Sequence, residues 1–218
     1  MVLSKYSQLD TPALLIDMDL VRSNIAAMQA KADKYGVSLR PHTKTHKMPE
    51  LAKLQIAAGA RGITVAKVGE AEVMAAAGLS DIFIANQIVG IRKLERIRQL
   101  ARQIKIRLGV DNPVQIDQLA TVFRDEPQPV EVLIEIETGE NRSGVIEEAQ
   151  LIQLVKHIQA QTKVVLKGVF SHEGHTYKAK SSEDCRRLCL DSQNRTLWAA
   201  KLVRELGADI DTVSIGAT

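Results

Sequence analysis

The sequence predicts an α/β protein, a parallel (β/α)8 barrel of the TIM type. Short β-branched runs alternate with helical segments along the whole chain, and this order gives a parallel sheet covered by helices. Residues 82–85 and 164–166 are apolar throughout, as strands buried on both faces are. Because no Gly-x-Gly-x-x-Gly follows the first or second expected strand, we favour the closed barrel over the open dinucleotide-binding sheet.

The chain divides into expected strands and helices in strict alternation. Apolar and β-branched runs mark the strands, at residues 13–16, 37–41, 62–66, 81–86, 104–110, 130–137, 164–171 and 212–215. Apolar residues at helical spacing mark the helices between them, at residues 20–35, 49–58, 69–77, 91–102, 113–123, 146–161 and 183–206. Gly36, Gly59, Gly78 and Gly207 stand where a glycine commonly ends a helix.

Composition and charge exclude several classes of partner. The 218 residues carry 29 Lys and Arg against 26 Asp and Glu, a net charge of +3 without a basic run, so we expect neither nucleic acid nor a membrane surface as a partner. A hydrophobic share of 45% is typical of a globular protein, and only 3% aromatic residues suits helices packed on a buried sheet. Because no linker or internal repeat is detected, we place one domain over residues 1–218. The sequence starts without the apolar core of a signal peptide and contains no membrane-spanning run. We therefore expect a cytoplasmic protein.

Two cysteines, Cys185 and Cys189, stand four residues apart in an expected helix. This spacing places both thiols on one face and makes no disulfide framework. A metal site with His172 and His175 is one interpretation. Buried or half-buried thiols on a helix are the other, which we favour, and we assign no metal ligand in this chain.

Polar residues with chemistry to offer cluster where the expected strands end. In a parallel barrel these carboxyl ends form the functional face. They carry His42, Lys44, His46, Asn86, Asn141, Arg142, residues 172–177, Ser214, Gly216 and Thr218.

Residues 40–47 are the most informative segment. If the segment stays extended, His42, Lys44 and His46 alternate onto one side, and two imidazoles flank one amine. Desolvation and the cationic neighbours Arg40 and Lys47 then favour the neutral, nucleophilic amine that a Schiff-base lysine needs. A solvated basic loop is the alternative that composition leaves open.

Residues 41–47, with the sequence PHTKTHK, resemble the cofactor-lysine motif of the D-threonine aldolase and D-serine dehydratase family. Further matches follow in order along nearly the whole chain, at residues 10–14, 62–66, 70–71, 81–82, 85–86, 135–139, 141–142, 144, 174–177 and 213–218. Members of this family are pyridoxal-phosphate enzymes of fold type III, whose N-terminal domain is a barrel of the alanine racemase type. The resemblance implies this fold and this cofactor.

The resemblance also implies roles for residues at the strand ends. Lys44 would form the Schiff base with pyridoxal phosphate and later act as a base at the substrate Cα, with His42 beside the cofactor. Arg142 would meet the pyridine nitrogen, and a guanidinium, which keeps its protons, leaves that nitrogen unprotonated. The alternative for Arg142 is a surface ion pair with Glu137 or Glu140.

Ser214, Gly216 and Thr218 match the phosphate-binding turn of the family, where backbone N–H groups and hydroxyls at a strand end hold a dianion. A plain loop is the alternative. The position of these residues after the last expected strand favours the phosphate site.

His172, His175 and Tyr177 fall in the stretch that lies near substrate and cofactor in the family. Either histidine could be the second acid or base, and His175 ranks first because the match is better there. A hydrogen-bond network within a loop is the alternative. Phe170 stands where relatives place a tyrosine against the cofactor ring, and His157 is expected on the surface of a helix.

The resulting function is a pyridoxal-phosphate-dependent lyase that acts on D-configured β-hydroxy amino acids, as D-threonine aldolase and D-serine dehydratase do. An amino-acid racemase and a non-catalytic pyridoxal-phosphate-binding protein are alternatives within the same cofactor chemistry. A class I aldolase that uses Lys44 without a cofactor is a further alternative.

The family pattern continues beyond this sequence. Relatives add one more barrel strand and a C-terminal β-domain, which supplies the ligands of a divalent metal and tends to associate with the first strand, here residues 13–16. We therefore expect an incomplete barrel with two open edges. A truncated chain of this kind would bind cofactor weakly, and the family also makes a homodimer an expected partner.

Overall fold

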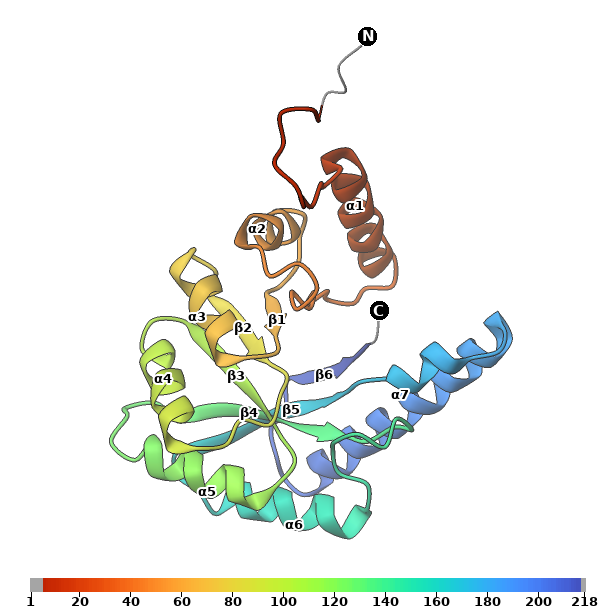
Figure 1. Ribbon diagram of the computed structural model, residues 1–218. Helices are drawn as coiled ribbons and strands as arrows, with labels where there is room; N and C mark the ends of the chain where they lie inside the picture. The colour runs from red at the N-terminus through yellow and green to blue at the C-terminus, as the bar shows by residue number, and fades with distance from the viewer. Residues whose placement is uncertain (1–5, 217–218) are drawn as a thin grey trace.

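The computed structural model describes residues 6–216 and shows six parallel strands in one sheet, where spatial order follows chain order. The strands are β1 (Ile63–Val65), β2 (Asp81–Ile84), β3 (Lys105–Val110), β4 (Val130–Ile136), β5 (Val164–Ser171) and β6 (Thr212–Ile215). The sheet curls into a half-barrel (Figure 1). A doubly wound sheet would reverse its strand order, so the predicted α/β barrel is confirmed as an incomplete one.

Helices cover the outer face of the curled sheet and one of its edges (Figure 1). The outer helices are α3 (Val68–Ala76), α4 (Ile91–Ala101), α5 (Pro113–Val122), α6 (Glu148–Gln159) and α7 (Ser182–Glu205). Two further helices, α1 (Met18–Lys34) and α2 (Pro49–Ala57), lie beyond β1, and a short 3-10 helix η1 (Gly174–Lys178) follows β5. The predicted helix-ending glycines, Gly36, Gly59, Gly78 and Gly207, all have positive φ. No helix within the described residues is long and apolar enough to span a membrane.

Alternation along the strands separates an outer core from an inner face. Outward residues such as Ile84 and Leu108 belong to the large core between sheet and helices. Inward, Phe83, Leu133 and Phe170 form a separate buried cluster, in which the two phenylalanine rings meet edge to face at 4.9 Å. The middle of the half-barrel is therefore apolar on both faces.

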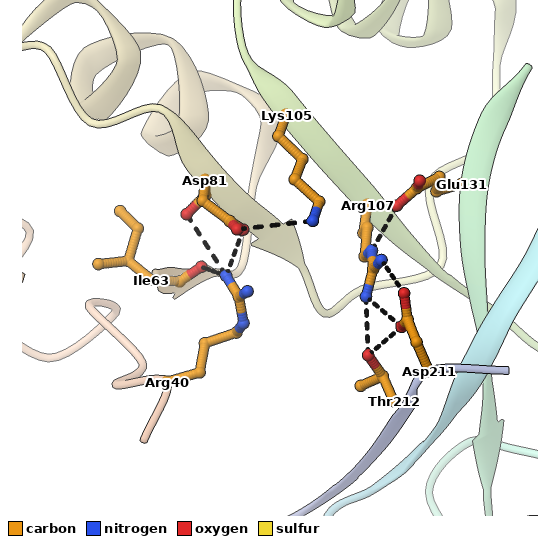
Figure 2. A network of polar contacts seen from close by, with 8 residues as sticks. All are labelled: Arg40, Ile63, Asp81, Lys105, Arg107, Glu131, Asp211 and Thr212. Atoms are coloured by element: carbon orange, nitrogen blue, oxygen red, sulfur yellow. Dashed lines mark hydrogen bonds and ion pairs between the residues drawn. The ribbon is translucent and has the colours of Figure 1, made fainter. Parts of the chain in front are cut away.

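Two interior arginines organise the amino-terminal end of the half-barrel (Figure 2). Arg107 on β3 is 5% exposed and donates to Glu131 on β4 at 2.5 Å and to both carboxylate oxygens of Asp211 at 2.9 Å. Arg40 pairs with Asp81 at the start of β2 at 2.8 Å. These pairings compensate the desolvation of the buried Arg107 and of the half-buried Arg40.

Two expected strands are absent. Residues 13–16 have no regular secondary structure and pair with no strand, and Leu14 is 90% exposed. This apolar run has no partner strand among the described residues. Residues 37–41 are also not a strand; the following residue, His42, forms an isolated bridge with Thr64 of β1. Pro41 accepts a hydrogen bond from the N–H of Thr64 but has no N–H to donate, which limits the ladder.

Gly168 on β5 provides a test of how closely β6 packs against β5. A Cβ at Gly168 would clash with the carbonyl oxygen of Thr212, so we predict that Gly168→Ala lowers the free energy of unfolding by about 1–3 kcal/mol. Gly69→Ala is the matched control because its Cβ would meet only Arg96 at 3.7 Å. Urea unfolding of both variants measures the difference. Equal stability of the two variants would contradict the close approach.

Candidate active site

Thr43 fixes the turn that carries Lys44 at the carboxyl end of β1. The backbone N–H and the hydroxyl of Thr43 both donate to the carbonyl of Thr64, at 2.8 and 3.1 Å. Residues 43–46 then turn, and the N–H of Lys47 donates to the carbonyl of Thr43 at 2.8 Å. Lys44 is exposed on this turn.

The expected alternation of His42, Lys44 and His46 onto one side is wrong because the chain turns instead of staying extended. His46 accepts a hydrogen bond from the N–H of Met48, at the start of α2, through Nδ1 at 3.0 Å. Its Nε2 is buried and has no hydrogen-bond partner in the described part of the chain. His46 therefore belongs to the helix start rather than to the group around Lys44.

His42 remains beside Lys44. Its Nδ1 accepts a hydrogen bond from the backbone N–H of Lys44 at 3.2 Å. Burial, followed by the charge of Lys44, lowers the pKa of His42 to about 4, and the proximity of His172 contributes in the same direction. His42 is thus a neutral imidazole near pH 7, and its hydrogen bond with the backbone N–H of Lys44 places it beside that residue.

Glu70 on α3 ties the turn to the end of β1. One carboxylate oxygen accepts from the N–H of Ala66 at 2.8 Å, and the other pairs with Lys47 at 3.4 Å. This carboxylate also favours the charged form of His42. Glu70 therefore places a negative charge next to the cationic turn.

Arg142 is held between two carboxylates on the loop after β4. It lies 3.4 Å from Glu140 and 3.8 Å from Glu135, with half of its side chain exposed. The alternative of an ion pair with Glu140 thus describes a contact that exists. Glu137 instead accepts from the backbone N–H groups of Gly139 and Asn141, at 2.7 and 2.6 Å, and bends the loop.

Glu135 is a buried carboxylate on the inner face of β4. Gln87 and the hydroxyl of Ser143 both donate to it, the latter at 3.0 Å. Burial raises the pKa of Glu135, and these hydrogen bonds and the charge of Arg142 oppose the rise. Its carboxylate lies 3.8 Å from Arg142 and adds a negative charge beside it.

His172 follows directly after β5 and lies near Arg142 and Glu140 at the carboxyl ends of the strands, which form the mouth of the half-barrel. Its Nδ1 lies 3.3 Å from the carbonyl oxygen of Gly216, and its Nε2 lies 3.7 Å from Glu140. The ring of Tyr177 stands edge-on at 6.4 Å. Burial and then the charge of Arg142 lower the pKa of His172. The end of β6 is therefore in contact with the group around Lys44.

The predicted phosphate turn lies at this same end. Ser214 alternates with Val213, which packs against the outer core, so Ser214 belongs to the inner face. Gly216 follows and is exposed, whereas Thr218 lies outside the described residues. Phe170, paired in register with Ser214, belongs to the buried interior cluster.

The structure places His175 in a different environment. Its Nε2 lies 3.4 Å from the hydroxyl of Ser192 on α7, and its Nδ1 is buried without a hydrogen-bond partner among the described residues. A Cβ at Gly139 would lie 2.9 Å from the ring. His172, and not His175, adjoins His42 and Lys44.

Sequence reasoning missed the acidic residues that orient the cations. Glu135 and Glu173 carry no role in the sequence prediction, and Glu140 appears there only as a possible ion-pair partner of Arg142. Glu173 is nevertheless 4% exposed and accepts from the hydroxyl of Ser171 at 2.9 Å. A signal existed for Glu135, because Glu131 and Glu135 interrupt an otherwise apolar strand at inward positions.

The two cysteines and His157 lie on helices. Cys185 and Cys189 are free thiols on α7. No group of three or more His, Cys, Asp or Glu side chains within residues 6–216 is arranged to hold a metal ion. His157 on α6 pairs with Asp117 at 2.7 Å on the surface.

The fold and site define a class, the parallel barrels that present a lysine at the carboxyl ends of their strands. The profile of the alanine racemase N-terminal domain matches residues 16–218, and the chain belongs to this family.

Two relatives and one more distant structure show where the chain stands within this fold. D-threonine aldolase of Arthrobacter sp. is 37% identical over 97% of this chain and 56% of its own length. The structure of D-threo-3-hydroxyaspartate dehydratase from Delftia sp. HT23 is 36% identical, with a TM-score of 0.91 over 97% of this chain and 56% of that one. Alanine racemase from Streptomyces lavendulae, at 23% identity and a TM-score of 0.74 over 92% of this chain and 51% of its own, shares the fold. The chain spans about half the length of each.

The His42 imidazole gives a direct test of the site's electrostatics. We predict that His42 titrates at a pKa of about 4, below the ordinary value of 6.5. Between these values the unfolded chain binds more protons than the folded chain, so His42 makes the free energy of unfolding fall as the pH is lowered through this window. NMR titration of the histidine ring protons, with His42→Asn for assignment, measures the pKa. A value near 6.5 would contradict the buried, cation-flanked position.

Proposed function

We propose that this chain is the pyridoxal-phosphate-binding part of a lyase that acts on D-configured β-hydroxy amino acids. The observation that supports this proposal best is the exposed Lys44 at the carboxyl end of β1, with His42, His172 and Arg142 around it. The relatives named D-threonine aldolase and D-threo-3-hydroxyaspartate dehydratase give the substrate class.

The residues present fit the cofactor. Lys44 supplies an amine for an aldehyde, and the fixed charge of Arg142 suits an anionic ring substituent or ring nitrogen. Ser214 and the backbone around Gly216 stand at the end of a parallel strand, where phosphate groups are commonly held. When bound, pyridoxal phosphate supplies an electron sink for the bonds at the substrate Cα.

The side chains of Lys44, His42 and Arg142 would hold the cofactor and position protons and charge around it. Lys44 would hold the cofactor aldehyde through Nζ and, once released, exchange a proton at the substrate Cα. His42, kept neutral by burial and by the charge of Lys44, lies beside that amine without adding a second positive charge. Arg142 cannot accept a proton, and Glu135 and Glu140 keep it at the mouth.

His172 is the residue best placed to handle a proton at the substrate hydroxyl. It faces the mouth between Gly216 and Glu140, and its lowered pKa makes it a neutral acceptor near pH 7. We therefore propose His172 in the role for which the sequence ranked His175 first, and a structural role for His175 on α7.

A lysine-specific adduct tests the cofactor site. We predict that reduction of the pyridoxal-phosphate complex with borohydride leaves the added mass on the peptide that contains Lys44. Lys44→Ala abolishes both this adduct and the visible absorbance band. Lys53→Ala, an exposed lysine on α2, is the control and retains both. An adduct on another lysine in the unmodified chain would overturn the assignment.

Kinetic measurements distinguish the proposed roles of His172 and His175. His172→Gln should lower kcat with D-threonine or D-serine by about 100-fold or more, the scale of a lost acid or base. His175→Gln should change kcat less than tenfold, because its ring contacts α7 rather than the group around Lys44. A larger loss in His175→Gln than in His172→Gln would reverse the roles.

The racemase alternative predicts different products. A lyase releases glycine and an aldehyde, or a keto acid with ammonia, whereas a racemase converts D-alanine into L-alanine without cleaving it. The lyase relatives are 36–37% identical and the alanine racemase is 23% identical, which favours the lyase. A cofactor-binding protein without turnover would give the absorbance band and no product.

A further inference from the structure

We propose that Arg107, at the amino-terminal end of the barrel, is a positioning residue for the phosphate site at the opposite end of β6. This inference rests on the proposed function. It concerns a residue that touches neither cofactor nor substrate and acts through the strand that carries Ser214 and Gly216.

Arg107 holds the start of β6 to the interior of the sheet (Figure 2). Its two terminal nitrogens each donate at 2.9 Å to one oxygen of Asp211, and Nη1 also donates to the hydroxyl of Thr212 at 2.7 Å. Nε donates to Glu131 on β4 at 2.5 Å. One side chain on β3 therefore links the beginning of β6 to two strands that β6 does not pair with.

The start of β6 is anchored outward by Ile210 and Val213 in the large core, and Arg107 supplies the side-chain contacts on its inner side. Among the described residues β6 pairs with β5 alone, over four residues. Gly168 on β5 allows a close approach to the backbone of Thr212. Arg107 contacts the hydroxyl of Thr212 from the inner side of the sheet. A strand of this length spans roughly 13 Å, so a change in its direction at Thr212 moves Ser214 and Gly216.

Charge explains why an arginine is needed at this position. Burial would raise the pKa of Asp211, but the Arg107 hydrogen bonds hold it at about 2, so the carboxylate is ionised at neutral pH. Glu131 faces the same guanidinium. Without the guanidinium the two carboxylates repel each other and β6 separates from the inner face. A lysine could bond to only some of the acceptors Asp211, Thr212 and Glu131, because it lacks the planar fork of donors.

Arg40 provides a matched comparison at the same end of the barrel. It pairs with Asp81 at 2.8 Å and donates to the carbonyl of Ile63 at 3.3 Å. It precedes the turn that carries His42 and Lys44 in the chain. Arg40 thus supports the amine side of the site, whereas Arg107 supports the phosphate side.

The experiment compares two ligands that differ only in the phosphate. Dissociation constants of pyridoxal phosphate and of pyridoxal are measured by absorbance titration for the unmodified chain, Arg107→Lys, Asp211→Asn and Arg40→Lys. We expect Arg107→Lys and Asp211→Asn to weaken binding of pyridoxal phosphate about tenfold and binding of pyridoxal less than twofold. Arg40→Lys should weaken both ligands by the same factor. Arg96→Lys, in a surface pair with Glu72, should change neither.

Equal weakening of both ligands in Arg107→Lys and Asp211→Asn, or no weakening in either variant, overturns the inference. Circular dichroism and thermal unfolding establish that the variants fold, and Asp211→Asn carries the test if Arg107→Lys does not. Failure of the proposed function is distinct: pyridoxal phosphate would then form no borohydride-stable adduct on Lys44 in the unmodified chain. In that case both proposals are wrong. If the adduct on Lys44 forms but Arg107→Lys weakens binding of both ligands equally, only the role of Arg107 is overturned.

Discussion

Two hydrogen bonds from Thr43 to the carbonyl of Thr64 determine where the Lys44 amine stands. They end the extended course of the chain beside β1 and start the turn on which Lys44 projects. The hydroxyl of Thr43 is buried with the bond it makes, so the alternative partner, water, is excluded. Every other member of the site, from Glu70 to His172, is arranged around this turn.

The inner face of the half-barrel is layered by polarity. Ion pairs of Arg40 and Arg107 occupy the amino-terminal end, the cluster of Phe83, Leu133 and Phe170 occupies the middle, and histidines, an arginine and carboxylates occupy the carboxyl end. The apolar layer separates two charged layers, so each set of cations is balanced locally. At the carboxyl end, Glu135 and Glu140 lie 3.8 and 3.4 Å from Arg142, whose side chain remains half exposed.

Much of this arrangement could be predicted from the sequence. Alternation of apolar runs gave the extent of β5 at residues 164–171, and helix-ending glycines gave the limits of several helices. The turn at residues 43–46 could not be predicted, because it depends on a partner 21 residues away. The separation of His172 from His175 depends on η1 and on Ser192 of α7, contacts that no local pattern encodes.

A crystal structure of the chain with pyridoxal phosphate tests the central claim most directly. The account predicts continuous density from Nζ of Lys44 to the aldehyde carbon, with the phosphate at the end of β6 beside Gly216 and the ring between His172 and Arg142. Density that joins the cofactor to another residue, or a phosphate bound away from β6, would contradict it.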